Sequence, residues 1–108
     1  MKEKAIINAV LLEGDEFKKT VHSYCAAAVL NGKAKTASSL LRSIYKELRA
    51  NDNIDTDIRS NITVLDYPHF PSYLDFIAYC DVSNDPAKVD FFYMKSEFVR
   101  LLMERAGV

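Results

Sequence analysis

The clearest pattern along the chain is a helical repeat of apolar residues between Asp15 and Arg49. In the first part of this stretch, apolar side chains recur every three or four positions and share an arc of about 100° on a helical wheel. They are Phe17, Val21, Tyr24, Cys25 and Ala28. Asp15 is placed to cap this helix, and Asn31-Gly32 supplies the left-handed residue that ends it. The pattern predicts one amphipathic helix between Asp15 and Asn31.

A further helix is predicted from the residues after Thr36. Thr36 or Ser38 can cap its start, because a side-chain oxygen there accepts from the first unpaired amides. Its apolar stripe is Ala37, Leu40, Leu41, Ile44 and Leu48. The side chains on nearly the opposite side are basic, namely Lys35, Arg42, Lys46 and Arg49. We therefore expect a helix that is aliphatic inside and basic outside.

Residues 4–12 precede both of these helices and predict a short first helix. Ile6, Ile7, Val10 and Leu11 fall on one side of a helix, and Gly14 stands where a C-cap glycine would. A buried strand over the same residues is the alternative, since periodicity does not separate the two for so short an apolar run.

The segment ANDNIDTDIRS, residues 50–60, is polar and acidic and marks a possible subdomain boundary. Oxygen-bearing side chains from Asn53 onward partly match a calcium loop. However, Ile58 stands where the sharp turn needs glycine, and Val64 where a bidentate glutamate is needed. A capped polar turn accounts for the same residues.

From Asn61 onward the apolar period changes to two, which is typical of strands. Strands are expected around residues 62–64, over 74–82, and over 89–94 after a turn at Asn84-Asp85-Pro86. A helix from Ser72 to Cys80 is the alternative to the middle strand. The last predicted element is a helix capped by Ser96 and stopped by Gly107, with an inward face of Phe98, Val99, Leu102, Met103 and Ala106.

These elements together predict an α+β fold. An N-terminal three-helix segment (residues 1–50) would be followed by a small antiparallel sheet of about three strands and a C-terminal helix (residues 61–108). At 108 residues the chain is expected to form one domain.

Composition and charge narrow the class of protein. Apolar residues make up 49% of the chain, which suits a globular domain. Residues 1–50 hold nine Lys and Arg against five acids, whereas residues 51–108 hold five against ten. This asymmetry favours head-to-tail self-association, or an acidic and a basic partner on different faces.

The sequence also predicts a location. The longest uncharged run, Thr20 to Gly32, is too short and polar to span a bilayer, and no secretory cleavage site follows the N-terminus. A cytoplasmic location is therefore expected.

The order of motifs AIINAVLLEGDEF, AAAVLNGK and ASSLLRSI over residues 5–48 resembles the small helical domain found ahead of AAA-type ATPase modules in some bacterial and phage proteins. The resemblance implies an adaptor-like or partner-docking helical piece. The phosphate-binding motif GxxxxGK[ST] is absent, so no nucleotide hydrolysis is implied.

Residues for catalysis are few. His22 and His69 are far apart in sequence, and Cys25 and Cys80 are isolated thiols on predicted apolar faces rather than a CxxC pair. A divalent-metal nuclease is a minor alternative, on the residues Asp66, Asp75, Asp90, Lys95 and Glu97. We expect no cofactor, no metal and no catalysis.

The stretch YPHFPSY carries the composition most typical of a binding site, because aromatic side chains on a proline-stiffened loop lose little entropy on binding. The candidate partner-binding residues are Tyr67, His69, Phe70 and Tyr73. The sequence thus favours a non-catalytic protein-binding or regulatory module, such as a bacterial or phage adaptor or inhibitor. The alternative is a small nucleic-acid-binding protein that contacts phosphates through Lys35, Arg42, Lys46 and Arg49.

Overall fold

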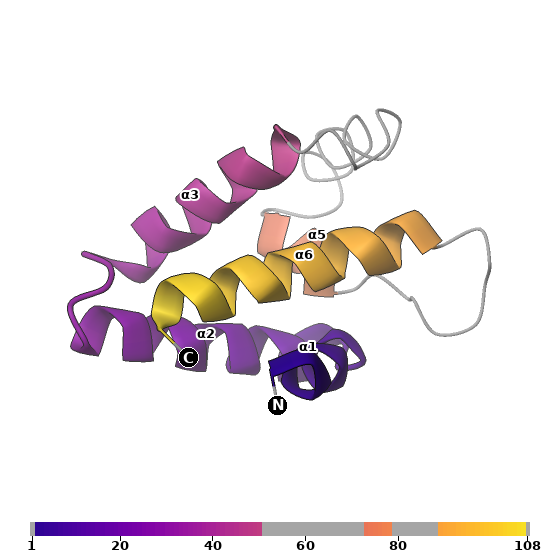
Figure 1. Cartoon of the computed structure of the whole chain (residues 1–108), viewed down its shortest axis with the longest axis horizontal. Helices are drawn as coiled ribbons and strands as arrows, with labels where there is room; N and C mark the ends of the chain where they lie inside the picture. The colour runs from indigo at the N-terminus through magenta and orange to yellow at the C-terminus, as the bar shows by residue number, and fades with distance from the viewer. Residues whose placement is uncertain (1, 51–72, 79–88, 108) are drawn as a thin grey trace.

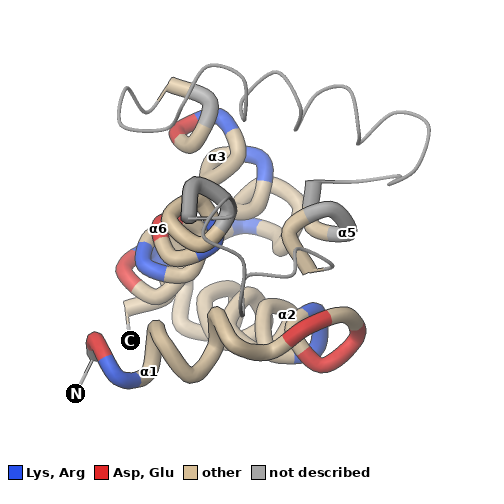
Figure 2. Tube along the Cα trace, turned by 90° about the vertical axis from the view of Figure 1, so that its right-hand side faces the viewer, with Lys and Arg blue, Asp and Glu red and all other residues tan. Residues whose placement is uncertain are grey.

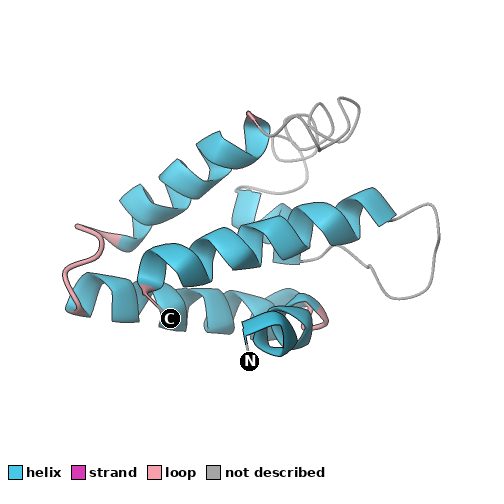
Figure 3. Ribbon diagram, in the orientation of Figure 1, coloured by secondary structure: helices cyan, strands magenta, loops and turns pink. Residues whose placement is uncertain are grey.

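The computed structural model describes residues 2–50, 73–78 and 89–107, and every regular element in them is a helix (Figure 3). The helices are α1 (Lys2–Val10), α2 (Gly14–Leu30), α3 (Ala37–Arg49), α5 (Tyr73–Ala78) and α6 (Val89–Ala106). The predicted α+β fold is therefore wrong, since the described part of the chain is all-α. None of its helices is both long and apolar enough to cross a membrane.

Helix α6 occupies the centre of the arrangement. Figure 1 shows it running between α3 and α2, and it contacts α1, α2 and α3. Helix α5 packs against α2. The core accordingly surrounds α6, whose buried apolar side chains are Met94, Phe98, Val99, Leu101, Leu102, Met103 and Ala106.

Helix α2 follows the predicted pattern closely, with Phe17, Val21, Cys25 and Ala28 buried. It begins differently, because Glu13 is the N-cap residue and Asp15 lies in the first turn. The predicted cap at Asp15 is therefore wrong, although its carboxylate still stands at the positive end of the helix dipole.

The end of α2 confirms the predicted left-handed stop. Gly32 has a φ of 74°, and its amide donates to the Val29 carbonyl oxygen at 3.1 Å. The amide of Lys33 donates to the Ala28 carbonyl oxygen at 2.8 Å. This pair of bonds satisfies carbonyls that the helix end leaves without partners and turns the chain toward α3.

Helix α3 begins at the predicted cap. The amide of Ser39 donates to Thr36 Oγ1 at 3.0 Å, and the amide of Thr36 donates to Ser39 Oγ at 3.3 Å. The two residues thus cap each other reciprocally. The predicted apolar stripe is confirmed as well, with Leu40, Ile44 and Leu48 buried and Ala37 and Leu41 partly buried.

Helix α1 confirms the predicted helix over the alternative strand, but its buried face is turned from the expected one. Ala9 and Val10 are buried, whereas Ile7 and Leu11 are 50% and 55% exposed. Gly14 is not the C-cap of α1, since α1 ends at Val10 and Gly14 is the first residue of α2.

The two predicted strands at residues 74–82 and 89–94 are wrong where the structure describes them. Residues 73–78 form α5, as the alternative helix predicted. Its buried residues Leu74, Ile77 and Ala78 follow a spacing of three and four rather than two. The strand expected at 62–64 and the connector at 51–60 lie outside the described residues.

Helix α6 starts at Val89, so Ser96 lies inside the helix and does not cap it. The predicted inward face from Phe98 to Ala106 is confirmed. So is the stop at Gly107, which has a φ of 77°.

An aromatic contact joins three helices in the core. The Phe98 ring of α6 lies between Phe17 of α2, at a centroid distance of 6.1 Å, and Tyr45 of α3, at 5.8 Å. The Tyr45 and Phe98 planes differ by 19°, a stacked geometry. One side chain therefore sets the spacing of α2 and α3 against α6.

Candidate functional site

Most of the predicted partner-binding loop lies outside the described residues, namely Tyr67, His69 and Phe70. Tyr73 is the first residue of α5, and its side chain also lies outside them. The binding role of these residues stays a prediction.

The predicted basic face is brought together only in part. Arg42 and Lys46 are one turn apart on α3 and both are exposed. Lys35 is exposed but precedes the Thr36 cap, so it belongs to the α2–α3 loop rather than to the helix. Arg49 is the last residue of α3, and its side chain is not described.

A longer charge pattern surrounds these residues, and sequence reasoning missed it. No Asp or Glu occurs from Phe17 to Lys46, thirty residues that contain six Lys and Arg. This acid-free stretch covers most of α2, the loop and most of α3, and Figure 2 shows the basic positions along α3. A search for runs free of acids would have found it, whereas counting charges by halves did not.

The first acid after this stretch is neutralised by a contact between helices. Glu47 Oε2 lies 2.6 Å from Arg105 Nη2, which joins α3 to the last turn of α6. Within the part of the chain that the structure describes, no ion pair involves Lys33, Lys35, Arg42 or Lys46. The hairpin from Phe17 to Lys46 therefore carries a net positive charge.

Apolar side chains are exposed at the end of α2, beside these cations. Leu30 is 86% exposed and Val29 is 38% exposed. Single exposed leucines are common on protein surfaces, but these two immediately precede a loop that lines a pocket. Lys33 and Ala34 of the loop, three and four residues after Leu30, line that pocket.

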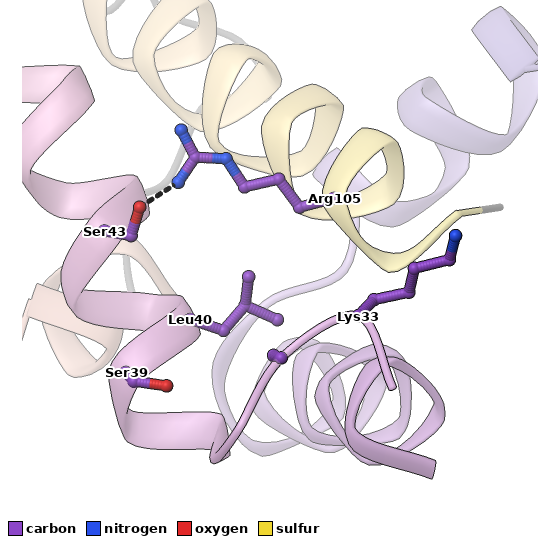
Figure 4. Close-up of a pocket in the computed structure, with 6 residues that line it drawn as sticks. Lys33, Ser39, Leu40, Ser43 and Arg105 are labelled. Carbon is purple, nitrogen blue, oxygen red and sulfur yellow. Dashed lines mark hydrogen bonds between the residues drawn. The ribbon is translucent and has the colours of Figure 1, made fainter. Parts of the chain in front are cut away.

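The pocket lies between the start of α3, the α2–α3 loop and the end of α6, and its volume is about 280 Å³. It is lined by Lys33, Ala34, Ser39, Leu40, Ser43 and Arg105. Figure 4 shows the Leu40 side chain in this space and the Arg105 guanidinium reaching across it to donate to Ser43 Oγ. The pocket is lined by both apolar and polar side chains.

Lys33 follows the side of the pocket rather than filling it. Figure 4 shows its side chain extending along the end of α6, and its Cε would lie 3.3 Å from a Cβ built on Gly107. The ammonium group therefore stands near the negative end of the α6 dipole, an arrangement that stabilises a cation there. We call the surface formed by Val29, Leu30, Lys33, Lys35 and the pocket the hairpin end.

The described residues that were candidates for nuclease or thiol chemistry are buried or bonded to other residues. Lys95 is fully buried and donates to the Leu12 carbonyl oxygen at 2.7 Å, and Glu97 pairs with Arg100 at 2.7 Å. Asp66 and the side chains of Asp75 and Asp90 lie outside the described residues. Burial raises the pKa of the Cys25 thiol, which disfavours the reactive thiolate. His22 is exposed, and no group of three potential metal ligands occurs among the described residues.

Comparisons of the chain with protein-family models, with curated proteins and with solved structures find no match. The resemblance to the helical domain ahead of AAA-type ATPase modules stays a prediction.

Proposed function

We propose that the protein is a small non-catalytic protein-binding module that docks its partner at the hairpin end. The observation that carries this proposal is the exposure of Leu30, at 86%, at the end of α2, just before the loop residues Lys33 and Ala34 that line the pocket. Removing such a side chain from water stabilises a complex by about 1.5–3 kcal/mol if the burial is complete. An exposed aliphatic side chain among polar and charged residues matches the apolar centre and polar rim of a protein interface.

The apolar groups at this surface favour a protein over a nucleic acid. Single-stranded nucleic acids are bound by cations together with exposed aromatic side chains on which bases stack. The exposed apolar residues of the hairpin end are aliphatic, and Tyr24 of α2 and Tyr45 of α3 are partly buried. Val29 and Leu30 offer no stacking surface, but they complement apolar side chains.

Nucleic-acid binding is the second candidate, favoured by the exposed pair Arg42 and Lys46 within the acid-free stretch. If Lys35, Arg42, Lys46 and Arg49 all contacted phosphates, affinity would fall with salt on a log-log slope of about −3 to −4. Binding that depends on Val29 or Leu30 is not part of this alternative.

One capture experiment separates the two candidates. The whole chain is tagged and incubated with lysate with and without nuclease, and bound proteins are identified by mass spectrometry. We expect a partner that survives nuclease and is lost with Leu30→Ser. The matched control is Leu11→Ser. Leu11 is the same residue type and is 55% exposed, but it lies before the start of α2, whereas Leu30 lies at its end. Partners that disappear with nuclease would support the nucleic-acid alternative instead.

The predicted aromatic loop is tested in the same assay. Phe70→Ala should weaken capture by the equivalent of about 2 kcal/mol or more if the loop also docks the partner. Loss of thermal stability with unchanged capture per folded molecule would remove Phe70 from the site.

A further inference from the structure

We infer that the partner presents an acidic segment and inserts one of its aliphatic side chains into the pocket between α3 and α6. This inference rests on the proposed function and specifies the chemistry of the partner.

The pocket, with a volume of about 280 Å³, is large enough to admit one aliphatic side chain. Leu40 and Ala34 are among its lining residues, and Leu40 is itself part of the core. An inserted side chain would therefore be buried against the fixed start of α3, which the Thr36 and Ser39 caps hold in place.

The pocket lining offers one hydroxyl group for the partner backbone. Ser39 Oγ is used within the chain, since it accepts from the Thr36 amide and donates to the Thr36 carbonyl oxygen at 2.9 Å. Ser43 Oγ accepts from Arg105, and no described residue accepts its proton. A serine hydroxyl has one donor and two acceptor sites, so Ser43 can donate to a carbonyl of a bound segment.

The exposed cations of the α2–α3 loop and of α3 favour an acidic segment. Lys33 and Lys35 are exposed in the loop, and Arg42 and Lys46 are exposed on α3. Residues 17–46 contain no acid, and Glu47, the next one along the chain, is paired with Arg105. A complementary charge on the partner speeds association and excludes basic segments.

The inference is tested by NMR titration of the full ¹⁵N-labelled chain with three synthetic peptides of equal length. One carries Asp and Glu around a central Leu, the second replaces that Leu by Gln, and the third replaces every acid by Lys. We expect the acidic Leu peptide to shift the amides of Ala34, Ser39, Leu40 and Ser43 at peptide concentrations up to about 1 mM. The affinity of the Gln peptide should be lower by about fivefold or more, and the basic peptide should cause no shift.

A charge-reversed double variant locates the contact on the chain. The combined change Lys33→Glu and Lys35→Glu should lower the affinity for the acidic Leu peptide by about tenfold. Lys4→Glu, an exposed change on α1, should leave it unchanged. The amide spectrum of each variant checks that it is folded.

Several outcomes overturn the inference. Equal binding of the Leu and Gln peptides would mean attraction by charge alone, and shifts confined to other helices would place the contact elsewhere. Stronger binding of a duplex oligonucleotide than of the peptides at the same amides would assign the surface to nucleic acid. Absence of peptide binding, together with capture of a protein that Leu30→Ser abolishes, would reject the acidic segment and leave the proposed function standing. Absence of both would reject both.

Discussion

The ammonium nitrogen of Lys95 lies 4.5 Å from the centroid of the Phe17 ring, inside the core that joins α6 to α2. The same nitrogen donates to the Leu12 carbonyl oxygen at 2.7 Å, so α6 is also bonded to the turn between α1 and α2. A buried cation lowers stability unless hydrogen bonds and ring contacts replace its hydration. The contacts of Lys95 therefore fix the position of this turn.

Replacing Lys95 by Met tests this role. The variant keeps most of the apolar stem and removes the donor to the Leu12 carbonyl oxygen. We expect a loss of about 1–3 kcal/mol in the free energy of unfolding, because a part-buried carbonyl loses its partner. Urea denaturation measures it, and Lys19→Met at an exposed site of α2 is the control. Equal stability of the two variants would contradict the role given to Lys95.

The aromatic contact at Phe98 predicts a larger effect. Phe98→Ala should lower the free energy of unfolding by about 3–5 kcal/mol, because the ring is fully buried and contacts the rings of Phe17 and Tyr45. Phe92→Ala changes the same residue type on the same helix at a site that is 37% exposed, and should cost about 1 kcal/mol or less. Thermal and urea melts of both variants compare them; similar losses would show that Phe98 does not hold the core.

Gly32 allows a test of backbone conformation without steric change. A Cβ at this position would have no neighbour within 4 Å, so the cost of Gly32→Ala comes from its φ of 74°. We expect a loss of about 1–2 kcal/mol for alanine and less for asparagine, which tolerates the left-handed region better. Stabilities from denaturant titration should rank Gly, Asn, Ala; an alanine variant as stable as the parent would show that the end of α2 relaxes.

The thiol of Cys25 predicts a pH dependence of stability. Burial raises its pKa in the folded chain, so between the ordinary thiol pKa of about 8.5 and the raised value the folded chain keeps a proton that the unfolded chain loses. The free energy of unfolding therefore falls as pH rises through this window and is unaffected below it. In a Cys80→Ala background, Cys25 should also resist a thiol reagent until the chain unfolds.

The matched variant for this test is Cys25→Ala in the same background. Its stability should lack the part of the alkaline decline that Cys25 contributes. Labelling of the native parent within minutes, or identical pH slopes of the two proteins, would contradict the burial of Cys25.

The helices of the first half were predictable because local rules and packing agree there. In α2 the apolar spacing, the left-handed glycine and the small residues all favour one helix, and in α3 the Thr36 cap and the apolar stripe coincide. Arg42 and Lys46 followed from the same spacing, since residues opposite the buried stripe must face water.

The second half was mispredicted because the spacing of its apolar residues fits both a strand and a helix. Leu74, Phe76 and Ala78 alternate as in a strand, whereas Leu74, Ile77 and Ala78 are spaced as in a helix. The aromatic residues at 91–93 favour a strand by propensity, but Met94 and Lys95 continue the buried face of α6. A buried lysine is rare, and the pocket joins residues from α3 and α6 that are about sixty positions apart, so neither followed from local pattern.

The central place of α6 also has a consequence for synthesis on the ribosome. The helices that pack on it, α1, α2 and α3, all emerge before it, so their apolar faces have no common partner until residues 89–106 have left the exit tunnel. Contacts such as that between Lys95 and Leu12 close a loop of more than eighty residues, which slows folding relative to a bundle built from sequential neighbours. Until then the nascent chain exposes Phe17, Val21 and Ile44, and a chaperone that binds aliphatic and aromatic segments would meet it in this form.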